Sequence, residues 1–390
     1  MMPQVTPGVD LLLRNPKKFL GSSKVGVITN PTGVTSNLTS TIDALHCHDD
    51  VRLVAIFGPE HGARGDVQDA LTIESDTDAA TGLPIYSLYG DVLKPTAEML
   101  EDVEVLVFDI QDVGARFYTY TSTLTYCMEA ALKQGISIVV LDRPNPINGV
   151  SVEGNILDPS FASFVGLHPI PIRHGMTIGE LANLINADLD ADLHLVEMEG
   201  WNRRMWFDET DLPWIQPSPN MPTLETATVY PGTCLFEGTN ISEGRGTTRP
   251  FEYIGAPWID GARWAKNLND LGLRAVAFRA CYFTPIFSKY AGEQCGGVQI
   301  HVTDRDTYRS VETALYMITT AHDLWPNTFD WIAPSRNEYH HFDLLTGTDK
   351  IREAISNEVP VKEIVEGWRD ELDSFLDLRR WHLLYGGGVV

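Results

Sequence analysis

Long apolar runs and paired cysteines are both missing from this chain of 390 residues. No window approaches the roughly 18 consecutive apolar residues of a membrane-spanning helix, so no such helix is expected. Five scattered cysteines without a Cys-x-x-Cys pair predict neither a disulfide framework nor a zinc site. The short apolar patch near the N-terminus contains Asp10, which argues against a secretory leader. A cytoplasmic protein is therefore expected, or a secreted or periplasmic one if a leader has been removed.

Basic residues are also scarce. The chain has 29 Lys and Arg against 53 Asp and Glu, a formal net charge of −24. Binding of nucleic acid through its phosphates needs a basic surface, so no nucleic-acid partner is expected. An anionic substrate would have to be held by individual Arg or Lys side chains, because the overall field opposes its approach.

Several well-known site motifs are absent as well. The first strand-to-helix turn, residues 30–35, holds one glycine, whereas a dinucleotide site has G-x-G-x-x-G. The chain has no Walker A motif, no G-x-S-x-G nucleophile elbow and no H-E-x-x-H pattern. We therefore expect no cofactor and no bound metal. A metal-dependent hydrolase stays open as an alternative, because Glu60, His61, Asp66 and Asp109 could form a mixed oxygen and nitrogen site.

Strand and helix patterns alternate through the first half of the chain. Short apolar runs bounded by turn residues predict strands at 25–29, 51–57, 84–88, 103–110 and 136–141. Helical spacing of apolar residues over 121–133 separates the last two. Such alternation predicts an α/β fold, a Rossmann-like doubly wound and mostly parallel sheet with right-handed connections.

The pattern changes in the second half. Thr177 and Glu180 form a capping-box sequence that predicts the start of a helix, and a strand is expected at 194–198. Residues 213–257 are rich in Gly, Pro, Thr and Ser and are expected to form a long functional loop. Beyond them we expect strands near 274–283 and 297–302 and helices near 308–324, 348–354 and 361–375. We therefore predict a catalytic domain over 1–245 and a smaller C-terminal α+β domain over 246–390.

Four of the predicted strands end in polar residues followed by Gly or Pro. If the sheet is parallel, these endings share one edge, where open α/β sheets bind their ligands. The ending after the second strand brings together Glu60, His61 and Arg64. The other endings contribute Asn30, Asp109, Asp112, Arg116 and Asn145. We expect an active site at this edge.

Paired carboxylates are the chemistry that these endings favour. Glycoside hydrolysis uses an acid and a base or nucleophile about 5 to 9.5 Å apart, and Glu60 could be paired with Asp109 or Asp112. Burial near Pro59 would raise the pKa of Glu60 toward the working pH of a general acid. Asp109 and Asp112 could instead cap loops and pair with Arg116.

Two further segments have compositions that suit a sugar site, although alternate residues of the first, above all Phe117, could instead belong to the core. Residues 116–122 combine a cation, hydroxyls and the phenols of Tyr118 and Tyr120, which suit a sugar ring. Residues 237–248 are almost all polar or Gly. The candidate side chains in this second segment are Glu237, Asn240, Glu243 and Arg245.

These segments resemble the peptidoglycan exo-β-N-acetylmuramidases of the NamZ type, from about Gly8 to the C-terminus. The resemblance is carried by FGPEHGARG, FDIQDVGARFYTYTSTL, LDRPNPING, VEGNILD, PSPNMPT, YPGTCLFEGTNISEGRGTT and PFEYIGAPW. It implies a Rossmann-like domain, a smaller C-terminal domain and an active site in the cleft between them. It also implies removal of terminal β-1,4-linked N-acetylmuramic acid from the non-reducing end of peptidoglycan fragments.

The resemblance implies that Glu60, in the GPEHG motif, is the catalytic acid and base. No second carboxylate stands at a standard spacing, so the nucleophile is either another group, with Asp109 and Tyr118 as candidates, or the acetamide of the substrate. Asp112, Tyr120, Glu237 and Glu243 would shape the sugar site.

N-acetylmuramic acid carries a lactyl carboxylate, which a guanidinium reads well. Arg64, Arg116 and Arg245 are the candidates for this contact. The alternative from a different class is a cell-wall carbohydrate-binding protein without turnover.

Overall fold

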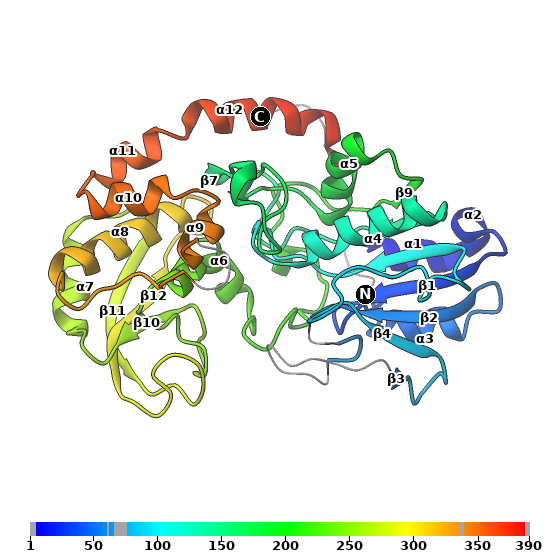
Figure 1. The fold of residues 1–390 in the computed structure, drawn as a ribbon, viewed down its shortest axis with the longest axis horizontal. Helices are drawn as coiled ribbons and strands as arrows, with labels where there is room; N and C mark the ends of the chain where they lie inside the picture. Colours follow the sequence, from blue (N-terminus) through cyan, green and yellow to red (C-terminus); the bar gives the residue numbers. More distant parts are fainter. Residues whose placement is uncertain (1–4, 61, 66–75, 335–338, 387–390) are drawn as a thin grey trace.

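A computed structural model describes residues 5–60, 62–65, 76–334 and 339–386. They form two lobes, each built on its own sheet, with the C-terminal helices running from one lobe to the other (Figure 1). His61 and Asp66, two of the residues singled out in the sequence, lie outside the described residues. Within the described part of the chain, no helix has the length and apolar character needed to span a bilayer.

The first lobe is a seven-stranded sheet whose order is β3-β4-β2-β1-β5-β6-β9. Its strands are β1 (Lys24–Thr29), β2 (Arg52–Gly58), β3 (Asp76–Thr77), β4 (Pro84–Ser87), β5 (Val105–Asp109), β6 (Ser137–Leu141) and β9 (Leu193–Val196). All pairs are parallel except that of β3, an antiparallel edge strand. The parallel strands, numbered along the chain, stand in the Rossmann order 3-2-1-4-5-6. The predicted fold class and strands are confirmed.

Helices cover both faces of this sheet because its strands alternate apolar side chains between the two faces. Val105 and Val107 of β5 pack with α1 (Gly8–Arg14), α2 (Pro16–Leu20) and α3 (Thr41–His46). Leu106 and Phe108 pack on the other side with α4 (Tyr120–Gln134) and α5 (Ile178–Leu189). The predicted capping box of Thr177 and Glu180 opens α5.

The second lobe holds an antiparallel sheet of order β10-β12-β11. Its elements are α6 (Leu224–Thr233), β10 (Tyr253–Ala256), α7 (Gly261–Asp270), β11 (Val276–Phe283), β12 (Cys295–Val302), α8 (Ser310–Leu324), α9 (His341–Thr346), α10 (Lys350–Ser356) and α11 (Val361–Glu366). The remaining elements are the pair β7 (Glu153–Ile156) and β8 (Pro171–Arg173) and the 3-10 turns η1 (Pro159–Phe161), η2 (Phe207–Glu209), η3 (Cys234–Gly238) and η4 (Arg380–His382). The domain boundary at residues 245 and 246 stays a prediction.

The expectation of one long loop over 213–257 is wrong in part, because α6, η3 and β10 lie within it. Helix α6 contains Pro231, which normally interrupts a helix, followed by Gly232. Its residues from Thr226 to Thr233 are all buried, so the helix shows no alternation of polar and apolar faces. The sequence pattern therefore gave no helical signal there.

The C-terminal segment ties the second lobe back to the first. Helix α12 (Arg369–Arg379) crosses between the lobes and ends near α5 (Figure 1). Beyond it, the Tyr385 hydroxyl donates a hydrogen bond of 2.6 Å to Asp142 Oδ2, just after β6. The backbone N–H of Leu384 donates to Glu180 Oε1 at 2.9 Å. The relative position of the lobes thus depends on the C-terminal residues as well as on the central connections.

The buried carboxyl of Asp142 makes the stability of the fold depend on pH. Burial raises the pKa of Asp142 to about 7, although Tyr385, Gly179 and Thr177 donate hydrogen bonds to it. The unfolded chain has an Asp pKa of about 3.9. Between these two pKa values the folded state binds more protons than the unfolded state. The stabilising contribution of Asp142 to the free energy of unfolding is therefore full below about pH 4 and is lost as the pH rises through about 7.

Urea unfolding is therefore expected to show a lower free energy of unfolding at about pH 8 than at about pH 5. Asp142→Asn is expected to reduce this difference, since the Asn side chain does not titrate. An unchanged difference in the variant would contradict the assignment.

Candidate active site

A cavity of about 530 Å³ lies between the two lobes. This volume is typical of a site for a small ligand. The first lobe contributes Glu60, Tyr118, Thr119 and Tyr120 to its lining, and the chain from α6 onward contributes Tyr230, Glu237, Arg245 and Phe287. A ligand bound there would contact both lobes.

Glu60 reaches the cavity because the chain turns sharply after β2. A Cβ atom added at Gly58 would lie 2.6 Å from the backbone nitrogen of Ala63, so only glycine permits this close return. The N–H of Gly62 closes the turn by donating to the carbonyl oxygen of Pro59 at 3.0 Å. Glu60 Oε2 accepts a long hydrogen bond of 3.5 Å from the hydroxyl of Thr119. Glu60 is therefore a partly buried carboxyl with a single weak partner among the described side chains.

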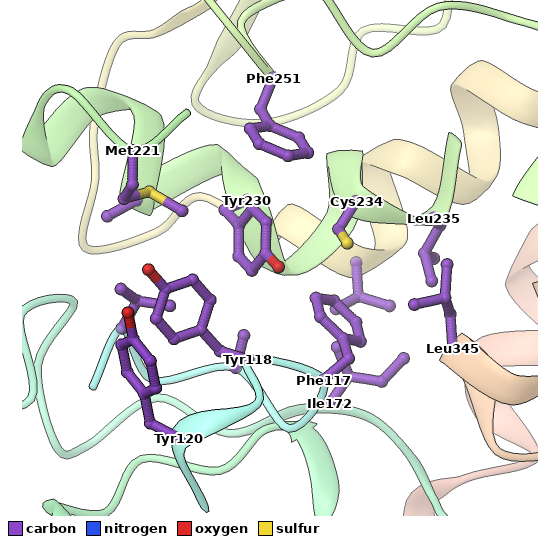
Figure 2. Close-up of a cluster of buried hydrophobic side chains, with 14 of the residues drawn as sticks. Phe117, Tyr118, Tyr120, Ile172, Met221, Tyr230, Cys234, Leu235, Phe251 and Leu345 are labelled. Carbon is purple, nitrogen blue, oxygen red and sulfur yellow. The ribbon is translucent and has the colours of Figure 1, made fainter. Parts of the chain in front are cut away.

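Aromatic rings from both lobes meet in one cluster (Figure 2). Tyr118, Tyr120 and Tyr230 of this cluster line the cavity together with Glu60. The Tyr118 ring lies 5.0 Å from that of Tyr120 and 5.7 Å from that of Tyr230, both edge to face. The Tyr230 ring in turn meets Phe251 edge to face at 4.8 Å. Such pairs add about 0.5–1.5 kcal/mol each beyond the area they bury, so this cluster stabilises the junction of the lobes as well as the cavity wall.

The two tyrosine hydroxyls of the first lobe have different surroundings. Tyr120 accepts a hydrogen bond from Asn30 Nδ2 and donates one to the carbonyl oxygen of Pro217, both at 2.7 Å. The Tyr118 hydroxyl is buried close to the hydroxyls of Ser218 and Tyr120, but it forms no hydrogen bond of good geometry among the described residues. Burial, with the nearby Tyr120, raises the pKa of Tyr118 well above its usual value. Tyr118 is therefore a neutral phenol, suited to donate a hydrogen bond to a ligand rather than to act as a nucleophile.

Glu237 is a second carboxylate at the cavity. Arg245 donates to its Oε1 through Nη2 at 2.8 Å and through Nε at 3.1 Å, and His341 Nε2 lies 3.6 Å from Oε2. Burial alone would raise the pKa of Glu237, but the charge of Arg245 and the contact with His341 outweigh it and lower that pKa to about 2. The Arg245 guanidinium also lies 5.1 Å from the centre of the Phe251 ring. The pair is therefore charged and fixed in place.

Glu243 Oε1 lies 3.6 Å from Arg245 Nε, but Glu243 is not part of the cavity lining. Lys289 Nζ donates to its Oε2 at 3.0 Å and to the carbonyl oxygens of Phe236 and Ile241 at 2.8 and 3.1 Å. Lys289 thus holds the segment that carries Glu237. Sequence reasoning missed this lysine, because 46 residues separate it from Glu243 and no local motif links them.

The structure does not bring Asp109 or Asp112 to the cavity. Asp109 is fully buried and accepts hydrogen bonds from Arg143 at 2.6 and 2.8 Å and from Thr41 at 2.5 Å. Asp112 Oδ2 accepts from the N–H of Gly114 at 2.7 Å and lies 3.5 Å from His174 Nε2. The expected pairing of these carboxylates with Arg116 is wrong, because Arg116 donates to backbone carbonyl oxygens instead. Arg143 and Thr41 hold Asp109, whereas Asp112 Oδ1 is buried without a hydrogen-bond partner among the described residues.

Arg64 and Arg116 also lie outside the cavity lining. Arg64 forms ion pairs with Asp78 at 2.5 Å and Asp43 at 2.8 Å. Arg116 is buried, and burial lowers its pKa to about 9. Its guanidinium donates to four carbonyl oxygens at 2.7 to 3.0 Å, those of Asn155, Ile170, Leu345 and Thr346. Of the three candidate arginines, Arg245 alone lines the cavity in the described part of the chain.

Two predicted asparagines brace loops. Asn145 donates to the carbonyl oxygen of Met176 at 2.9 Å and accepts from the N–H of Ile147 at 3.1 Å. Asn240 donates to the carbonyl oxygen of Thr328 at 2.7 Å and accepts from the N–H of Asp330 at 2.9 Å. Within the described ranges, no three His, Cys, Asp or Glu side chains are grouped so that they could hold a metal ion.

Comparison with known proteins gives matches over nearly the whole chain. Models of the N-terminal and C-terminal parts of the exo-beta-N-acetylmuramidase NamZ match residues 25–225 and 228–385. The peptidoglycan beta-N-acetylmuramidase NamZ of Bacillus subtilis (strain 168) is 52% identical over 385 residues, which cover 98% of this chain and 92% of the relative. Crystal structures of two DUF1343 family proteins of Bacteroides fragilis match with TM-scores of 0.90 and 0.77 at 39% and 31% identity. Each match covers 98% of this chain and 99% of the other.

Proposed function

Because the chain belongs to the exo-beta-N-acetylmuramidase NamZ family, we propose that it is an exo-acting glycoside hydrolase of peptidoglycan fragments. It releases terminal β-1,4-linked N-acetylmuramic acid from the non-reducing end. The observation that carries this proposal is the near-full-length identity of 52% to a peptidoglycan beta-N-acetylmuramidase. The cavity between the lobes is large enough for a terminal sugar and holds the acidic groups that the reaction needs.

Glu60 is the general acid in this proposal. Its carboxyl protonates the glycosidic oxygen as the bond from that oxygen to C1 breaks, and its carboxylate then takes a proton from the water that attacks C1. The support for this role is that Glu60 lines the cavity and has one weak partner among the described side chains. A carboxyl held by strong ion pairs, such as Asp109, would not be free to exchange its proton.

Arg245 reads the lactyl carboxylate in the same proposal. A protein of net charge −24 needs a local cation to accept an anionic sugar, and Arg245 lies at the cavity while Arg64 and Arg116 do not. Its position is fixed by Glu237 and by the Phe251 ring. A substrate without the lactyl group leaves this contact unmade, which favours muramyl over glucosaminyl sugars.

The experiment compares kcat/KM for 4-nitrophenyl β-N-acetylmuramide and 4-nitrophenyl β-N-acetylglucosaminide. The protein is expected to prefer the muramide by on the order of 10²-fold or more. Arg245→Met should lose most of this preference. Arg249→Met, a matched loss of charge at a side chain outside this cavity, should keep it.

Failure to hydrolyse the muramide would contradict the proposed function. Calorimetric binding of muramyl sugars without hydrolysis would instead support the carbohydrate-binding alternative. If Arg245→Met and Arg249→Met show the same preference for the muramide, the role of Arg245 is contradicted, but the muramidase function is not.

A further inference from the structure

The cavity contains a second carboxylate whose task the family resemblance leaves open. We propose that Glu237 accepts a hydrogen bond from the acetamido N–H of the terminal N-acetylmuramic acid and thereby assists attack of the acetamide oxygen on C1. This inference rests on the proposed function, and it names the group that faces Glu60 across the sugar.

Placement in the cavity is the first argument. In the part of the chain that the structure describes, Glu60 and Glu237 are the carboxylates that line the cavity. They come from opposite lobes, Glu60 after β2 and Glu237 from η3. The Glu237 side chain is 21% exposed, whereas Glu243 and Asp109 are buried and are held by Lys289 and Arg143. A sugar in the cavity would meet Glu237 and not these other carboxylates.

The contacts of Glu237 define what it can do. Arg245 holds Oε1 through two hydrogen bonds, while Oε2 has, among the described residues, only the longer contact with His341. An ionised carboxylate has about four acceptor positions on its two oxygens and no donor. Glu237 is therefore an acceptor of fixed orientation with capacity for an additional N–H group.

The same contacts argue against the two other roles that a second carboxylate takes in glycosidases. A general base works best when its pKa is near the working pH, and the pKa of Glu237 is lowered to about 2. A carboxylate stabilised so strongly by Arg245 is also a weak nucleophile toward C1. Acceptance of a charge-assisted hydrogen bond requires neither a proton transfer nor a covalent bond.

The proposed hydrolysis has two steps. The acetamide oxygen forms a bond to C1 while the bond from C1 to the leaving oxygen breaks, and Glu60 gives its proton to that oxygen. The cyclic oxazolinium ion carries a positive charge on its N–H group, which the Glu237 carboxylate stabilises. Water then forms a bond to C1 and loses its proton to Glu60, and the bond from C1 to the acetamide oxygen breaks. The acetamide and the Glu60 carboxyl are both restored.

The first test uses the intact protein and a series of 4-nitrophenyl β-muramides with N-acetyl, N-fluoroacetyl, N-difluoroacetyl and N-trifluoroacetyl groups. Fluorine makes the amide oxygen a poorer nucleophile, so kcat is expected to fall steeply along the series. A kcat that is insensitive to fluorine would overturn the inference while leaving the muramidase activity itself established.

The second test uses Glu237→Gln, which preserves the shape of the side chain but removes its charge. We expect kcat for the N-acetyl substrate to fall by on the order of 10²-fold, as when a preorganised group that stabilises transition-state charge is removed, with a small change in KM and no recovery of activity in azide. Glu293→Gln, a matched change at an exposed carboxylate of the same lobe, should retain the parent kcat. Parent-like kcat in Glu237→Gln, or formation of an α-configured glycosyl azide by Glu237→Ala, would overturn the inference, the latter by making Glu237 a covalent nucleophile.

Discussion

Glu60→Gln is expected to lower kcat/KM by about 10² to 10⁴-fold, the usual contribution of general acid catalysis. The amide of Gln has no acidic proton to give to the leaving oxygen. 4-Nitrophenol leaves readily without protonation, whereas the hydroxyl of N-acetylglucosamine does not. The loss should therefore be larger for a muramyl-glucosamine disaccharide than for the 4-nitrophenyl muramide, as measured by sugar analysis and by absorbance.

The control for this variant is Glu101→Gln, which removes the charge of an exposed carboxylate from the same lobe. It is expected to behave as the parent protein with both substrates. A Glu60→Gln protein with a near-normal rate, or with the same loss for good and poor leaving groups, would contradict the assignment of Glu60 as the acid.

Arg116→Met is expected to lower the free energy of unfolding by about 3 to 5 kcal/mol. The substitution leaves buried carbonyl oxygens of Asn155, Ile170, Leu345 and Thr346 without the guanidinium that joins them. Asn155 Nδ2 still donates to the Thr346 oxygen, so part of the network remains. Urea unfolding measures the loss. Arg116→Lys should recover only part of it, because an ammonium group lacks the planar fork of donors.

The Arg116→Met variant also distinguishes a structural role of Arg116 from a role in substrate binding. The sequence predicted that it could bind the substrate, whereas the structure buries it between the first lobe and α9. A structural role predicts a lower stability with little change in KM for the folded fraction. A raised KM with unchanged stability would show instead that Arg116 contacts the sugar.

The sequence predicted the parallel sheet well because each strand is a short apolar run bounded by turn residues. It predicted the cavity residues Glu60, Tyr118, Tyr120, Glu237 and Arg245 because they stand in segments rich in side chains that can contact a sugar. It gave no sign of α6, whose buried side chains and Pro231 hide the helical period.

The partners of charged residues were the least predictable part of the site. Arg143 is 34 residues from Asp109, and Lys289 is 46 residues from Glu243. An isolated motif shows that a carboxylate or guanidinium is present, but not whether a distant residue already pairs with it. For this reason Asp109, Arg64 and Arg116 resembled site residues in the sequence, while the fold gives each of them other partners.

A crystal structure of Glu60→Gln with the disaccharide N-acetylmuramyl-β-1,4-N-acetylglucosamine bound tests the proposed site most directly. We expect the terminal muramyl ring in the cavity between the lobes, with its glycosidic oxygen beside residue 60. The acetamido N–H should lie at Glu237 and the lactyl carboxylate at Arg245. A sugar bound outside this cavity, or bound within it with the glycosidic oxygen remote from residue 60, would contradict the proposed role of Glu60.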